Sequence, residues 1–114
     1  MRRGEIWTAS GGKDYAGQPR PVLILQDDRF DGTESVTVCA ITTDPTEAPL
    51  FRLPVRPGEE NGLRAACRLM VDKITTVPRA RLGTLVGRLA DPDMVRLNRA
   101  LVLFLGVAGP SGDE

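Results

Sequence analysis

Short runs of apolar residues, separated by turn-forming residues, dominate the hydrophobic pattern of this chain. Six of these runs have the length and composition of β-strands. They cover residues 4–10, 20–26, 35–42, 50–55, 67–74 and 82–89. The fourth run, LFRLPV, contains a proline, which removes a backbone donor and therefore suits an edge strand or a strand end.

The third run, SVTVCAIT, alternates with the period of two that is typical of a strand. One face would carry Val36, Val38 and Ala40, and the other Thr37, Cys39 and Ile41. The run ends at two threonines, Thr42 and Thr43. By itself, a threonine at this place is a β-favouring residue that closes a strand.

The last apolar segment, residues 91–106, has helical instead of strand periodicity. Apolar side chains recur at helical spacing, namely Met94, Leu97, Leu101 and Phe104. Asp91 is the expected N-cap, Pro92 the first helical residue and Gly106 the stop signal. The sequence therefore predicts one C-terminal helix, followed by a flexible tail over residues 107–114.

Together, these elements predict a mainly-β fold. Five or six short strands with hairpin-length connections and one helix indicate a small antiparallel barrel or half-open sheet with the helix packed against it. A chain of 114 residues is long enough for one core, so we expect a single domain over residues 1–106.

The formal net charge of zero conceals an uneven distribution of charge along the chain. Residues 61–90 carry six cations and one anion, whereas residues 21–60 carry three cations and eight anions. If the cations of residues 64–88 lie near Arg20, they form a basic face that could hold a polyanion. Alternatively, they pair with the acidic residues of segment 27–34, and composition does not decide between the two arrangements.

The residue types exclude several kinds of chemistry. The chain has no histidine and only two cysteines, Cys39 and Cys67, which we expect to be reduced core residues. We therefore expect no metal site and no cofactor. No apolar stretch is long enough to cross a bilayer, and the start MRRGEIW lacks the apolar centre of a signal peptide, so we expect a cytoplasmic protein.

The stretch GQPRPVLILQ places an arginine and a proline directly before a buried-looking strand. Arginine is costly to bury and proline cannot donate to a sheet ladder, so Arg20 and Pro21 mark a strand entrance. Either this is an ordinary strand start, or it holds a cation at a defined place.

Five motifs precede the amphipathic helix, and together with it they cover residues 1–106: MRRGEIW, RPVLIL, TVCAITT, MVDKITTV and LVGRL. In this order and at these separations they resemble the MazF/PemK family of bacterial toxins. The resemblance implies an SH3-like barrel of the kind shared by CcdB and PemK toxins. It also implies a homodimer that binds RNA along a groove near the dimer interface and cleaves it without a metal.

The resemblance assigns the catalytic pair to Arg20 and Thr42. It implies attack by the 2′-hydroxyl of the RNA, which leaves a 2′,3′-cyclic phosphate and a 5′-hydroxyl end. Arginine stays protonated, so Arg20 would act as a clamp on the developing phosphorane instead of a base, and Thr42 would orient the phosphate or the 2′-hydroxyl.

RNA contacts are expected from the loop after the first strand and from the basic segment. The resemblance makes Lys13, Asp14, Gln18, Thr43 and Lys73 candidates. Asp72 either contacts RNA or pairs with a nearby arginine. Met70 stands where some relatives have an arginine, so Arg68 or Lys73 would supply that cation. Arg79 and Arg81 either follow the RNA backbone or belong to a solvated face.

Two aromatic residues are candidates for stacking on bases, as unpaired RNA is often recognised in this way. Trp7 lies inside a predicted strand, where core packing is the favoured interpretation. Phe30 lies in the acidic turn after the second strand.

The implied partner is an antitoxin whose acidic disordered segment would fold over the RNA groove, with DNA contacted only through the toxin–antitoxin complex. Two alternatives remain at this stage. One is a CcdB-like gyrase poison, although this chain ends in GVAGPSGDE without the tryptophan of those toxins. The other is a noncatalytic barrel in which Arg20 only neutralises a nucleic-acid phosphate or an acidic peptide.

Overall fold

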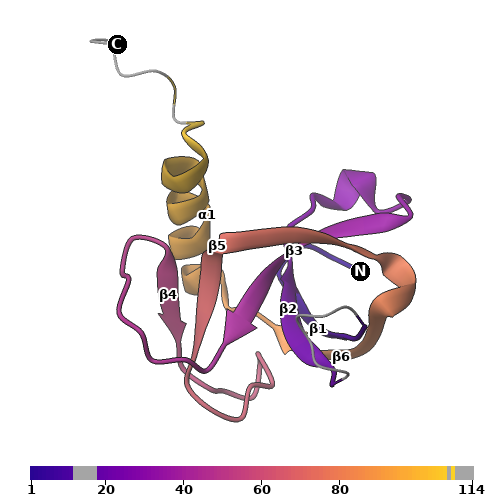
Figure 1. Cartoon of the computed structure of the whole chain (residues 1–114), viewed down its shortest axis with the longest axis horizontal. Coiled ribbons are helices and arrows are strands. Elements are labelled where there is room, and N and C mark those ends of the chain that lie inside the picture. Colours follow the sequence, from indigo (N-terminus) through magenta and orange to yellow (C-terminus); the bar gives the residue numbers. More distant parts are fainter. Residues whose placement is uncertain (12–17, 108, 110–114) are drawn as a thin grey trace.

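The computed structural model describes residues 1–11, 18–107 and 109, and shows one curved sheet with one helix (Figure 1). The strands are β1 (Glu5–Ala9), β2 (Arg20–Ile24), β3 (Ser35–Thr42), β4 (Arg52–Val55), β5 (Cys67–Pro78) and β6 (Leu82–Arg88). The helix α1 spans Asp91–Leu105, and two 3-10 turns span Asp28–Phe30 and Arg79–Arg81.

All neighbouring strands are antiparallel, in the order β4-β5-β3-β2-β1-β6. This arrangement confirms the predicted mainly-β fold with a C-terminal helix. Pro54 lies in β4, an edge strand, as the proline in that run predicted.

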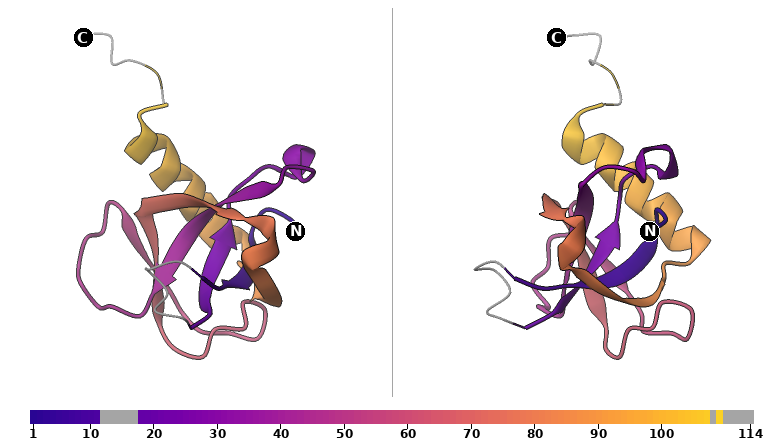
Figure 2. Two further views of the ribbon diagram at one scale, coloured as in Figure 1. Left: turned by 45° about the vertical axis from the view of Figure 1, so that its right-hand side comes forward. Right: turned by 90° about the vertical axis from the view of Figure 1, so that its right-hand side faces the viewer.

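The loop between β4 and β5 closes the curved sheet by packing against the opposite edge strand, β6 (Figure 2). The amide of Arg88 donates to the carbonyl of Glu60 at 2.8 Å. A side chain at Gly87 would collide with the backbone of Asn61. Asn61 is buried, and its Oδ1 accepts bonds from the amides of Gly58 and Leu63. The loop therefore has a defined shape, and it can approach β6 this closely only because Gly87 has no side chain.

The buried side chains form two clusters on opposite sides of β2 and β3. The larger cluster lies against α1 and includes Leu23, Cys39 and Ile41, whereas the smaller one includes Val36 and Val38. This division confirms the alternation predicted for residues 35–42. Both faces of these strands are buried. One face packs against α1, and the other packs against side chains from other strands of the curved sheet.

Trp7 packs against the smaller cluster, and its Nε1 donates to Glu5 Oε1 at 3.0 Å. The interpretation of Trp7 as a packing residue is therefore supported. Cys39 and Cys67 are both buried and free, as expected. Burial raises the pKa of the Cys39 thiol to about 12, so it stays protonated and inert at neutral pH.

The helix begins one residue earlier than predicted, at Asp91 instead of Pro92. The prediction of Asp91 as N-cap was wrong, because Ala90 is the extended residue before the helix and its carbonyl accepts the first helical bond, from Met94. Asp91 and Pro92 instead occupy the first turn, where an acid favours the positive end of the helix dipole. Gly106 ends the helix as predicted, with φ at 70°.

One face of α1 packs against the sheet. Leu97 and Ala100 are buried, and the ring of Phe104 lies 6.2 Å from that of Phe51. The C-terminal part of the helix projects past the sheet (Figure 1). In the described part of the chain, no helix is both long and apolar enough to cross a membrane.

Candidate functional site

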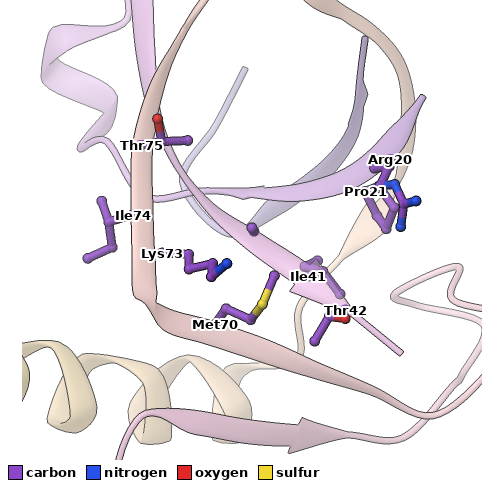
Figure 3. Close-up of a pocket in the computed structure, with 9 residues that line it drawn as sticks. Arg20, Pro21, Ile41, Thr42, Met70, Lys73, Ile74 and Thr75 are labelled. Carbon is purple, nitrogen blue, oxygen red and sulfur yellow. The ribbon is translucent and has the colours of Figure 1, made fainter. Parts of the chain in front are cut away.

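A pocket of about 420 Å³ lies where β3 ends, between β2 and β5 (Figure 3). Arg20 and Pro21 line it from β2, and Met70, Lys73, Ile74 and Thr75 line it from β5. Ala40, Ile41 and Thr42 form its floor on β3.

The register of β2 and β3 brings Arg20 and Thr42 together. Val22 lies opposite Ala40 in this antiparallel pair. Continuing that register by two residues places Arg20 opposite Thr42, with both side chains on the same face of the sheet. The two residues that the family resemblance assigned to catalysis, 22 positions apart in the sequence, therefore line one pocket.

The hydroxyl of Thr42 is held by the loop that follows β3. The amide of Asp44 donates to Thr42 Oγ1 at 3.1 Å. Asp44 is itself anchored, because its Oδ1 accepts bonds from the amide and the hydroxyl of Thr46, and these bonds lower the pKa of the Asp44 carboxyl. With one lone pair of Oγ1 occupied, the hydroxyl proton of Thr42 remains available to donate to a bound group.

The guanidinium of Arg20 is exposed at the rim of the pocket. Within the described ranges, no carboxylate lies close enough to form an ion pair with it. Its donors are therefore available for an anionic ligand.

A second hollow, of about 220 Å³, adjoins the first and shares Arg20 and Thr42 with it. Gln18 and Thr43 line this hollow, so the structure places both of these predicted contacts next to Arg20 and Thr42. Lys13 and Asp14 lie outside the described residues.

Asp72, the acidic residue of the MVDKI motif, was expected either to contact RNA or to pair with an arginine, and in the structure it pairs with an arginine. Asp72 receives two bonds from Arg52, from Nε at 2.8 Å and from Nη2 at 3.0 Å. Lys73, the next residue, lines the pocket. Of the two cations considered in place of an arginine at Met70, Lys73 is thus in the pocket, whereas Arg68 binds the carbonyl of Asp44 and the carboxylate of Glu47.

Arg79 lies at the opposite end of β3 from Thr42. It is half-buried, and its Nε donates to the carbonyl of Thr33 at 2.8 Å. Arg81 lies beside Gly11, where its carbonyl accepts a bond from the amide of Ser10. Neither side chain lines the pocket. The cations of residues 64–88 therefore do not all lie on one face with Arg20.

Phe30 is exposed in the turn after β2, with the guanidinium of Arg29 5.8 Å above its ring. One N-terminal cation reaches the acidic turn: Asp28 accepts a bond from the Arg2 side chain, and a second bond from the backbone amide of Arg3. Of the two arrangements considered for the cations of residues 64–88, Lys73 shares a pocket with Arg20, and among the described residues none of these cations forms an ion pair with an acid of segment 27–34.

Arg52 is a site-adjacent residue that the sequence did not indicate. Its partner is 20 positions away, and only the pairing of β4 with β5 brings the two together. Among the residues described, no group of three or more cysteine or acidic side chains could hold a metal ion.

Comparison with known proteins agrees with this geometry. Residues 2–105 match the family model described as PemK-like, MazF-like toxin of type II toxin–antitoxin system. The chain is 58% identical to a probable endoribonuclease MazF of Mycolicibacterium smegmatis, over 96% of this chain and all of that protein. It is 28% identical to the endoribonuclease MazF9 of Mycobacterium tuberculosis, over 92% of this chain and 96% of that one.

Solved structures share the fold. An endoribonuclease in complex with its cognate antitoxin, from a mycobacterial species, superposes with a TM-score of 0.76 at 25% identity, covering 96% of this chain and 99% of that one. The Mycobacterium tuberculosis toxin MazF-mt6 superposes with a TM-score of 0.73 at 29% identity, covering 87% and 93%. The chain therefore belongs to the family of PemK-like and MazF-like toxins of type II toxin–antitoxin systems.

Proposed function

We propose that this toxin is a metal-independent endoribonuclease that cleaves single-stranded RNA in the pocket formed by Arg20 and Thr42. The observation that carries the proposal is the convergence of these two side chains, from β2 and β3, in one open pocket of a family whose relatives are named endoribonucleases. A gyrase poison is not favoured, because the family model and the relatives belong to MazF and PemK toxins.

The reaction transfers a phosphoryl group within the RNA. The 2′-oxygen bonds to phosphorus, the bond from phosphorus to the 5′-oxygen breaks, and the products are a 2′,3′-cyclic phosphate and a 5′-hydroxyl. The proton of the 2′-hydroxyl passes to solvent, and the 5′-oxygen takes up one proton, so no metal or redox partner is needed.

The two side chains have different roles in this step. Arg20 remains cationic, and its planar guanidinium binds two oxygens of the phosphorane as negative charge develops on them. Thr42, whose oxygen accepts a bond from the Asp44 amide, donates a hydrogen bond to a phosphate oxygen or to the 2′-oxygen and thereby orients the reacting groups.

The partners follow from the family. We propose a cognate antitoxin, like the one bound to the mycobacterial endoribonuclease, whose acidic segment covers the cationic pocket and blocks RNA. The toxin would act as a cytoplasmic homodimer built from one domain over residues 1–106, and would meet DNA only through the toxin–antitoxin complex.

The first experiment compares cleavage of a long single-stranded RNA by the wild type, Arg20→Ala and Arg20→Lys, all in EDTA, with mapping of the new 5′ ends. We expect discrete cuts by the wild type and a loss of about 10²–10³ in rate for Arg20→Ala. Arg20→Lys keeps the charge but not the paired donors, so it should restore only part of the rate.

The products and the alternatives are tested in the same experiment. New 5′ ends that polynucleotide kinase labels without prior phosphatase treatment carry the expected 5′-hydroxyl. RNA that is bound but left intact would select the noncatalytic barrel, and cuts that persist in Arg20→Ala would reject Arg20 as the clamp.

A further inference from the structure

The long strand β5 contains an irregularity beside the pocket. Cys39 pairs with Ile74, but the next residue of β3, Ala40, pairs with Met70. One step along β3 therefore corresponds to four steps along β5, and three residues, Val71, Asp72 and Lys73, form a bulge. Bulges of this kind bend a strand and redirect its side chains, and β5 turns sharply beside Lys73 (Figure 3).

The three bulge residues point in three directions. Val71 is fully buried in the larger core cluster, and its amide donates to the carbonyl of Phe51. Asp72 reaches Arg52 on the neighbouring strand, and Lys73 reaches into the pocket. The position of Lys73 is thus determined by the anchors of the two residues before it.

The Arg52–Asp72 pair is the most enclosed ion pair among the residues described. Only 15% of the Arg52 side chain and 23% of the Asp72 side chain are exposed. Its two short parallel bonds have the bidentate geometry in which an arginine holds a carboxylate most firmly. The bulge is therefore fixed on its solvent side by charge and on its inner side by Val71.

Lys73 has the opposite environment. Its side chain is exposed, and within the described part of the chain it forms no hydrogen bond or ion pair. Figure 3 shows it extending from β5 toward β3, across the pocket from Arg20. Because Asp72 is engaged by Arg52, the carboxylate next to Lys73 does not neutralise it.

We infer that Lys73 is a second phosphate-binding cation of this pocket, and that Arg52, acting through Asp72, is the positioning residue that keeps Lys73 available for RNA. The inference rests on the proposed function, since it assumes that RNA occupies the pocket beside Arg20. A phosphate adjacent to the scissile one would lie between the two cations.

The inference is tested by RNA binding as well as by cleavage. The probe is a single-stranded RNA that contains the mapped cleavage sequence, with a 2′-deoxy nucleotide at the cut position so that it binds without reacting. Removing one phosphate contact to a single strand should lower the slope of log Kd against log salt by about 0.7. We expect this change in Lys73→Met. Arg29→Met, a matched control whose side chain is 80% exposed in the turn after β2, should keep the wild-type slope.

Arg52 is tested by a pair of variants that separates positioning from folding. Arg52→Met leaves the Asp72 carboxylate without its partner beside Lys73, and we expect the KM for RNA to rise about tenfold. Arg52→Met/Asp72→Asn has the same net charge at this place as the wild type, so most of the affinity should return. If the pair had only a structural role, Arg52→Met protein that is still folded at the assay temperature would keep the wild-type KM for RNA.

The outcomes distinguish this inference from the proposed function. Loss of cleavage in Arg20→Ala together with an unchanged salt slope in Lys73→Met would overturn the inference and leave the proposed function intact. An absence of cleavage by the wild type would remove both. Thermal unfolding of each variant shows whether it folds. If the Arg52 variants do not fold, Lys73→Met still tests the inference, because it changes only an exposed side chain.

Discussion

At the residue scale, the properties of the site depend on which polar side chains already have a hydrogen-bond partner within the protein. Thr42 accepts a bond from the Asp44 amide and Asp72 is held by Arg52, whereas Arg20 and Lys73 line the pocket with their cationic groups. The bonds to Thr42 and Asp72 fix the positions of these side chains, and the two cations remain available to bind a ligand. This division explains why one acid and one cation that are adjacent in the sequence have different roles.

Thr42→Val tests the hydroxyl with little change in volume. It removes the acceptor for the Asp44 amide and the donor for RNA, so we expect single-turnover cleavage to fall about 10²-fold and the unfolding free energy to fall by about 1 kcal/mol. Thr42→Ser keeps the hydroxyl and should stay within about tenfold of the wild-type rate. Wild-type cleavage by Thr42→Val would show that this hydroxyl takes no part in the reaction.

At the element scale, two local irregularities determine the shape of the barrel. The bulge in β5 bends that strand around the pocket, and the β4–β5 loop closes the sheet against β6. Both irregularities depend on close contacts. Val71 of the bulge is packed in the core, and the loop approaches the backbone of β6 at Gly87, which has no side chain.

Gly87→Ala tests the closure of the barrel. The added methyl group would meet the backbone of Glu60 and Asn61, which cannot move without breaking the bonds of the loop. We expect a loss of about 3 kcal/mol in unfolding free energy, measured by urea denaturation. The control is Gly32→Ala, where no heavy atom lies within 4 Å, and it should change stability by less than about 0.5 kcal/mol. Equal stability of the two variants would show that the loop does not constrain β6.

At the scale of the whole molecule, a formal net charge of zero coexists with a cationic pocket. This is possible because several acids are paired with groups that do not line the pocket. Asp28 accepts bonds from the N-terminal segment, and Asp72 is held by Arg52. Pairing, more than total charge, decides where the molecule presents a free positive charge to a polyanion.

The same pairing predicts how stability depends on pH. The bond from Arg52 lowers the pKa of Asp72, and local hydrogen bonds lower the pKa of Asp27 and Asp44. A carboxyl whose folded pKa is depressed stabilises the fold above its ordinary value near 3.8, and this contribution is lost as the pH falls through the folded pKa. The unfolding free energy should therefore decrease below about pH 4.

Denaturation series at pH 7, 4 and 3 measure this effect. Asp72→Asn should be less stable than the wild type at pH 7, and the difference should shrink as the pH falls. Asp31→Asn is the control, since Asp31 is exposed and its carboxylate accepts no hydrogen bond within the described residues. A constant difference between Asp72→Asn and the wild type across this range would contradict an ionic role for the pair.

Much of the architecture could be predicted from the sequence, because strands and helices are local patterns. The alternation at Val36, Val38, Cys39 and Ile41 and the stop at Gly106 depend on neighbours in the chain. The helix start was displaced by one residue, since an acid before a proline reads equally well as a cap or as a first-turn residue. Family motifs indicated Arg20 and Thr42, and strand register then placed them opposite each other.

By itself, then, the sequence determined the elements, their order and the identity of the catalytic candidates. The tertiary structure alone decided which charged groups are free. Lys73 and Arg79 are both cations of one basic segment, yet Lys73 faces the pocket and Arg79 is half-buried at the far end of β3. The physical reason is that the bulge in β5 and the partner of Asp72 arise from packing between strands distant in the sequence, which no local pattern records.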